Sequence, residues 1–270
     1  MKLQSETRRR IAQRVASLSG SLERCLGRFL GDELFGGPSL HFHRRAISQV
    51  RSHHDARDLL SDELYFEHLY ATLASWGLHR MGPGKAKLRD FPVFMQNARS
   101  LLREVAALFR CSMLDLSEGE MRDAAKQVGE AIERHKRAAG LTEAESVLVA
   151  NSKAIHHFLP DLVPPVDRAY TLMFFFNRTE PPGSEAETFV EMYPYFVDIA
   201  KRNEALIRAA VKICDSPCTR GDWNSGHAKV VDNALIGWVR LEKEAGRLRR
   251  GGTQLAGRGQ AARRSDGSVV

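Results

Sequence analysis

The sequence predicts an all-α protein, and two observations support this prediction. Apolar residues recur at three- and four-residue steps over most of the chain, as they do on one face of a helix. No segment of useful length alternates apolar and polar residues as a half-buried strand does. With 270 residues, 43% of them hydrophobic, the chain is long enough to bury a large core in a multi-helix bundle.

The first four helices are expected over residues 11–29, 39–54, 62–76 and 90–109. Gly36-Gly37-Pro38 breaks the chain between the first two of them. Ser39, Asp62 and Asp90 stand at the starts of the other three, where side chains of these types accept hydrogen bonds from free backbone amides.

The second half of the chain carries three sequence signatures of a capping box. They are the pairs Ser117/Glu120, Thr142/Glu145 and Ser184/Glu187. The helix that starts at Ser184 is expected to run to about Ile213 with a kink at Pro194, and a last helix covers residues 230–239. We expect one helical domain over residues 1–250, and chain breaks near 111–117 and 179–184 are consistent with two lobes.

The net charge of +7 lies entirely in the two ends of the chain. Residues 1–10 contribute +3 and residues 241–270 contribute +4, so the residues between them are neutral. Residues 251–270 are rich in Gly, Arg and Ser and are predicted to be a disordered basic tail. Such a tail suits either contact with DNA or a role in solubility, and the sequence leaves a protein partner open.

The longest apolar runs are much shorter than the roughly 20 residues of a membrane-spanning helix, so no membrane partner is expected. The first ten residues are charged and resemble no secretory signal, and four cysteines do not form a disulfide framework. A cytoplasmic location is therefore expected.

A basic loop is predicted between two of the helices. Its cations Arg80, Lys85, Lys87 and Arg89 are interleaved with Gly82-Pro83-Gly84. Exposed glycine amides beside cations suit a phosphate group, so these residues are candidates for nucleic-acid contact; a solvated loop is the alternative.

The central segment, residues 148–176, carries the candidate chemistry. Asp167 follows a Pro-rich loop and precedes a new apolar helix, where the helix dipole favours a negative charge. A fixed carboxylate of this kind stabilises an oxocarbenium ion or activates a water; a plain cap is the alternative. Lys153 falls on the side of its helix opposite the core arc, so it faces either solvent or a cleft.

This segment resembles the catalytic region of the helix–hairpin–helix DNA glycosylase superfamily. The order of Lys153, Pro165-Val166-Asp167 and Arg168 carries the resemblance, together with Ser75-Trp76-Gly77, and is most similar to an uncharacterised bacterial branch. The resemblance implies that Asp167 is the catalytic carboxylate and Lys153 a lyase nucleophile, with Arg168 beside the DNA. Val149 and Asn151 stand where the glycines of the hairpin would fall.

Two functions therefore remain open at this stage. The first is a DNA-associated base-excision enzyme of glycosylase/lyase type, which would flip a base into a cleft between helical lobes. The second is a non-catalytic nucleic-acid- or protein-binding protein with a degenerate glycosylase-like scaffold. No cofactor motif is present, and no metal site is predicted, because Cys214, Cys218 and His227 supply only three of the usual four zinc ligands.

Overall fold

The computed structural model describes residues 5–31, 37–79, 87–211 and 223–248. The helices in this part of the chain are α1 (Ser5–Ser19), α2 (Leu22–Leu30), α3 (Pro38–Ser52), α4 (Ala56–Ser61), α5 (Glu63–Ser75), α6 (Phe91–Glu104), α7 (Glu118–Arg134), α8 (Leu148–Phe158), α9 (Met173–Phe176), α10 (Glu185–Arg202), α11 (Glu204–Ala210) and α12 (His227–Glu244), with the short turns η1 (Ala106–Leu108), η2 (Arg137–Ala139) and η3 (Arg168–Leu172). These residues contain isolated β-bridges but no sheet, so the predicted all-α class is confirmed.

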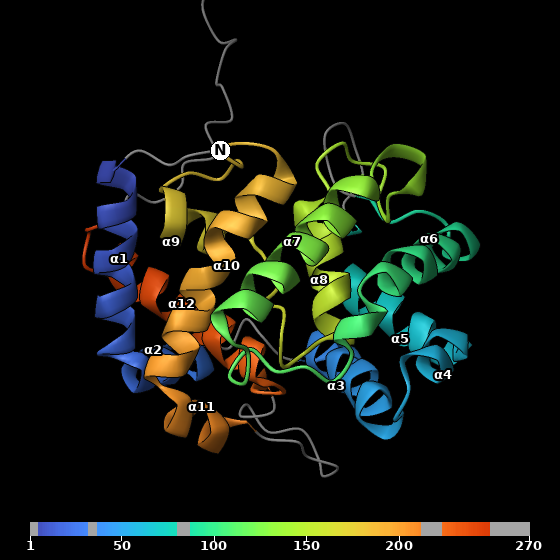
Figure 1. The fold of residues 1–270 in the computed structure, drawn as a ribbon, viewed down its shortest axis with the longest axis horizontal. Helices are drawn as coiled ribbons and strands as arrows, with labels where there is room; N and C mark the ends of the chain where they lie inside the picture. The colour runs from blue at the N-terminus through green and yellow to red at the C-terminus, as the bar shows by residue number, and fades with distance from the viewer. Residues whose placement is uncertain (1–4, 32–36, 80–86, 212–222, 249–270) are drawn as a thin grey trace, which may run out of the picture.

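Helices from the two ends of the chain pack together on one side of the bundle. Figure 1 shows α1 and α2 beside α10, α11 and α12, whereas α3 to α6 lie on the opposite side and α7 and α8 between them. One large hydrophobic core extends through both sides, with buried residues from Ile11 to Leu248. The aromatic run Phe174–Phe176 is buried within it. No helix in the described ranges is long and apolar enough to cross a membrane.

Helices α2 and α12 pack against each other backbone to backbone. A Cβ atom added at Gly237 would lie 1.9 Å from the carbonyl oxygen of Cys25 and 2.7 Å from its carbonyl carbon. Because the obstacle is backbone, no side-chain rotation can relieve it, and only glycine lets the two helices meet at this point.

Three of the predicted helix starts are confirmed. The side chain of Asp62 accepts a hydrogen bond of 3.0 Å from the amide of Leu64 at the start of α5. The capping boxes of α7 and α10 are both complete, with reciprocal bonds between the residues of Ser117/Glu120 and of Ser184/Glu187.

Other predicted boundaries were wrong for identifiable reasons. The expected helix over residues 11–29 is divided into α1 and α2 at Gly20, a residue of low helix propensity. Residue Ser39 lies inside α3, because the fixed backbone of Pro38 already suits the first helical position and Gly37 precedes it as the cap. Asp90 precedes α6 without accepting a capping hydrogen bond.

The expected capping box at Thr142/Glu145 is also absent from the described structure. Helix α8 begins only at Leu148, and the carboxylate of Glu185 caps it by accepting hydrogen bonds of 3.0 Å from the amide of Val147. The helix expected over 184–213 is divided into α10, which contains Pro194, and α11.

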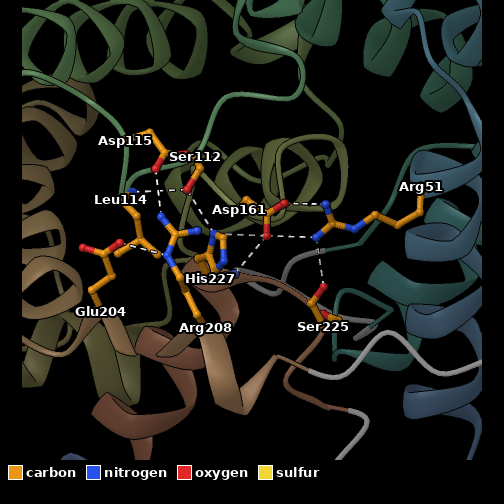
Figure 2. A network of polar contacts seen from close by, with 9 residues as sticks. All are labelled: Arg51, Ser112, Leu114, Asp115, Asp161, Glu204, Arg208, Ser225 and His227. Atoms are coloured by element: carbon orange, nitrogen blue, oxygen red, sulfur yellow. Dashed lines mark hydrogen bonds and ion pairs between the residues drawn. The ribbon is translucent and has the colours of Figure 1, made fainter. Parts of the chain in front are cut away.

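A polar network fixes the start of α12 against α3 and the loop after α8 (Figure 2). Both terminal nitrogens of Arg51 donate to the carboxylate of Asp161, one of them at 2.9 Å. Asp161 also accepts from the amide of His227 at 3.0 Å, and Arg51 donates to the carbonyl of Ser225 at 3.2 Å. The side chain of His227 is hydrogen-bonded to the hydroxyl of Ser112 at 3.0 Å.

The charges of this network suit its burial. Burial by itself would raise the pKa of Asp161, but the ion pair with Arg51 and the amide of His227 hold that pKa below its usual value. The backbone here is packed closely, because a Cβ at Gly226 would lie 2.5 Å from the carbonyl oxygen of Pro160. The first turn of α12 is therefore held in place by both packing and charge.

Candidate functional site

A cavity of about 310 Å³ opens where the two sides of the bundle meet. Its lining residues are Phe29, Ser39, Ser75, Trp76, Gly77, Lys153, Pro165, Asp167, Tyr170, Trp223, Lys229, Asp232 and Ile236. They come from α2, α3, the end of α5, α8, η3 and α12, so the cavity is built from segments far apart in the sequence. Both residues of the predicted catalytic pair are among them.

Lys153 lies in the cavity rather than in bulk water. The residue is only 8% exposed, because α8 is buried on nearly all of its faces and not only along the predicted core arc. Its Nζ lies 5.6 Å from the ring centroid of Trp76 and 3.9 Å from Oδ2 of Asp167. Of the two environments that the sequence allows for this side chain, the structure shows the cleft.

Asp167 uses its two carboxylate oxygens differently. Oδ1 accepts a hydrogen bond of 2.7 Å from the amide of Ala169, which confirms the predicted N-cap. Oδ2 is the atom nearest to Lys153. The cap thus fixes the carboxylate while leaving one oxygen toward the cavity, so the structural role does not compete with a chemical one.

The backbone after Asp167 is wound more widely than an α-helix. The amide of Leu172 donates to the carbonyl of Asp167 at 3.0 Å, a bond that spans five residues and makes η3 a π-helical turn. The amide of Asp167 donates to the hydroxyl of Thr171 at 2.9 Å. Single π-helical turns of this kind are frequent at functional sites.

A second ion pair lines the same cavity, and the sequence analysis missed it. Nζ of Lys229 lies 2.5 Å from Oδ2 of Asp232, and the two residues are 4% and 3% exposed. Three aromatic rings surround the ammonium group, at 5.8 Å for Phe29, 5.2 Å for Trp76 and 5.7 Å for Trp223. Burial raises the pKa of Asp232, although Lys229 acts in the opposite direction.

The signal that would have revealed this pair is a Lys-x-x-Asp spacing inside an otherwise apolar helix. Every residue from Ala228 to Arg240 is buried. Charged residues in such a helix are rarely buried unless they are paired.

A chain of neutral histidines lies behind the cavity. His157 Nδ1 is 2.7 Å from the carbonyl oxygen of Lys153, so this nitrogen carries the proton and donates. His157 Nε2 must then accept from Nδ1 of His43 at 2.9 Å, and His43 Nε2 accepts from the hydroxyl of Ser225 at 2.8 Å. The ring of His43 also stacks on that of Trp223, with centroids 5.2 Å apart.

Burial keeps His157, His43 and the adjacent His156 neutral. It lowers the pKa of His157 to about 3, and it lowers the pKa of His43 and that of His156 well below the usual value. Since each ring nitrogen of His157 and His43 has one fixed role, a proton added to either would break the chain. These hydrogen bonds between His157, His43 and Ser225 therefore connect α8, α3 and the segment before α12 behind Lys153.

The predicted nucleic-acid contacts are only partly within the described residues. Arg80 and Lys85 lie outside them. Lys87 lies 3.6 Å from a carboxylate oxygen of Glu143, and Arg89 donates to the backbone carbonyls of residues 137 and 140 at 2.7 and 3.1 Å. Arg168, with a 44% exposed side chain, pairs with Glu180 at 3.2 Å.

The start of α8 is turned toward the protein interior. Asn151, at one of the positions of the hairpin glycines, is buried and donates to two backbone carbonyls of residues 132 and 135 at 3.1 Å. The amide of Val147 is occupied by the carboxylate of Glu185, which is 7% exposed. The carboxylate of Glu185 therefore takes the place that a DNA phosphate would need at the amide of Val147.

The described residues contain no group of three or more side chains that could hold a metal ion. Cys214 and Cys218 lie outside the described ranges. His227 is engaged by Ser112 and Asp161 in the network of Figure 2.

The chain was compared with family models, with curated proteins and with solved structures. None of them matches it. The chemistry of the cavity is therefore argued from its own residues: two amines, two carboxylates and a wall of aromatic rings.

Proposed function

We propose that this protein is a DNA glycosylase/lyase in which Lys153 is the nucleophile and Asp167 the assisting carboxylate. The observation that supports the proposal is the placement of Nζ and Oδ2 of these residues 3.9 Å apart in one cavity. This distance is longer than a hydrogen bond, so a substrate atom can contact the amine and the carboxylate together.

The reaction begins with proton transfer from the Lys153 ammonium to Asp167, which frees the amine. Nζ then bonds to C1′ of the sugar, and the glycosidic bond breaks with its electron pair on the departing base, which takes up the proton held by Asp167. As this proton leaves, the carboxylate of Asp167 regains its negative charge near C1′ and stabilises the oxocarbenium character of the transition state. Asp167 next takes a proton from the bonded nitrogen and passes it to O4′ as the C1′–O4′ bond opens, so that an iminium ion links Lys153 to the sugar.

The aromatic wall suits a base rotated out of the duplex. Trp76, Trp223 and Tyr170 line the cavity beside Lys153. Aromatic side chains bind the faces of extruded bases, and an enzyme that acts at C1′ needs its nucleotide outside the stack.

A group of cations surrounds Tyr170 and suits the flanking phosphates. Arg240 donates to the hydroxyl of Tyr170 at 3.2 Å, and Nζ of Lys243 lies 5.3 Å from the Tyr170 ring. The charge of Arg28 acts on the same hydroxyl, and its guanidinium pairs with the carboxylate of Glu244 at 3.0 Å. The three cations exceed this one carboxylate in charge, so the group as a whole suits a phosphate near the cavity.

Borohydride trapping on a duplex with one abasic site tests the proposal directly. Reduction of the iminium ion should leave the full-length protein covalently attached to DNA, with the attachment mapped to Lys153. We expect K153A to abolish this product and D167N to slow its formation by about 10²-fold or more. K126A, at an exposed lysine of α7, is the matched control and should trap like the wild type.

Absence of a trapped product with the wild type, or equal trapping by folded K153A, would refute the proposal. If the protein binds DNA without trapping, and removal of residues 251–270 abolishes that binding, the non-catalytic function is correct.

A further inference from the structure

The Lys229–Asp232 pair stands out because its burial is unfavourable by itself. Removal of two charges from water costs more than their mutual attraction usually returns, and an apolar pair of similar volume is often as stable. Yet both side chains, 5% and 4% exposed, line the cavity rather than the core interior. This placement indicates a role toward whatever occupies the cavity.

The ammonium group of Lys229 has more N–H donors than the acceptors described around it. Among the described residues, the hydrogen-bond acceptor that Lys229 reaches is Asp232, and its other neighbours are ring faces of Phe29, Trp76 and Trp223. An ammonium group carries three N–H donors, and the rings offer no lone pair in return. A ligand acceptor in the cavity would complete its hydrogen bonding.

The pair is also correctly placed relative to the proposed nucleophile. Lys153 and Lys229 lie 5.6 and 5.2 Å from the same Trp76 ring. The charges of Lys153 and Asp167 both act on the carboxyl of Asp232, which places the two ion pairs near each other. A base held by the second pair can therefore have its sugar beside the first.

We infer that Lys229 and Asp232 recognise the polar edge of an oxo-base, meaning a base with a ring N–H next to a carbonyl. This inference rests on the proposed function. Lys229 only donates and Asp232 only accepts, so together they match an adjacent carbonyl oxygen and N–H. The N–H of such a lactam is more acidic than an exocyclic amine, which strengthens its bond to a carboxylate. Uracil and hypoxanthine therefore fit better than adenine.

The test measures binding of free bases to the full-length protein by quenching of tryptophan fluorescence, since Trp76 and Trp223 line the cavity. The probes are hypoxanthine and uracil, their N-methylated forms 1-methylhypoxanthine and 3-methyluracil, and adenine. We expect at least tenfold tighter binding of one oxo-base than of its N-methylated form or of adenine. D232N and K229M should each weaken that binding at least tenfold.

Two controls separate folding and chemistry from recognition. K136M removes the lysine of an equally spaced pair with Glu133 at the C-terminal end of α7, away from the cavity, and should bind like the wild type. Circular dichroism spectra establish whether each variant is folded. If K229M is unfolded, the near-isosteric D232N alone decides the test. An abasic site has no base to recognise, so trapping of the wild type on it reports the chemistry without the recognition.

The two ideas fail in different ways. Base binding that D232N weakens, without any trapping by the wild type, refutes the lyase and retains the recognition. Binding of adenine as tight as that of the oxo-bases, no binding of any probe by the wild type, or equal binding by folded D232N overturns the inference.

Discussion

Mild acid should destabilise this protein, because three histidines are buried in the neutral form. The pKa of His157 lies at about 3 in the folded protein, against 6.5 for an ordinary histidine. Between these values the unfolded chain binds a proton that the folded protein excludes, so stability falls as the pH falls below 6.5. Above pH 6.5 neither the folded nor the unfolded protein binds this proton, so the loss of stability is absent.

The size of the effect follows from the pKa difference. Each histidine of this kind costs about 1.4 kcal/mol of unfolding free energy per pH unit below 6.5, or about 2 kcal/mol at pH 5. Burial lowers the pKa of His43 and that of His156 in the same direction, so both add to this loss of stability in acid. The loss from His157 alone is already a substantial fraction of the stability of an ordinary protein, about 5–15 kcal/mol.

Urea unfolding between pH 7 and pH 5 measures this slope in a window above most carboxylate titrations. H157Q removes one titrating group, so its slope should be smaller by about 1.4 kcal/mol per pH unit. H54Q, at an exposed histidine, is the control and should keep the slope of the wild type. A stability that stays constant from pH 7 to pH 5, or an unchanged slope in H157Q, would show that the buried-histidine argument is wrong.

Two further substitutions test the packing and the capping. G237A should destabilise the protein by about 3 kcal/mol or more, because its methyl group meets the backbone of Cys25. G27A is the control and should be neutral or stabilising, because the space around its Cβ position is open. Equal effects of the two substitutions in urea unfolding would contradict the close contact between α2 and α12. E185A should cost about 1–3 kcal/mol by leaving the buried amide of Val147 unpaired, and hydrogen exchange at that amide should become faster; an unchanged rate would contradict the cap.

The fold class and several helix starts follow from the sequence because they depend on local physics. Periodicity and capping chemistry act within a few residues, which is why Asp62 and the Ser117/Glu120 box were predicted correctly. The Thr142/Glu145 pair fails for a tertiary reason, since the distant residue Glu185 occupies the role of the cap.

The candidate site was only partly predictable. The resemblance of residues 148–176 suggested the pair Lys153 and Asp167, and the structure places both in the cavity. The other pair, Lys229 and Asp232, reaches the cavity only through the packing of α12 against α2, which no local pattern encodes.

The residues that line the cavity come from both ends and the middle of the sequence, and this has a practical consequence. Its walls exist only when α2, α8 and α12 are all in place, so a molecule that occupies it binds the native state and not the unfolded chain. By mass action, a ligand at a hundred times its dissociation constant adds about 2.7 kcal/mol to the free energy of unfolding. A rise in the thermal transition can therefore report a natural ligand from a metabolite or oligonucleotide collection before any reaction is known.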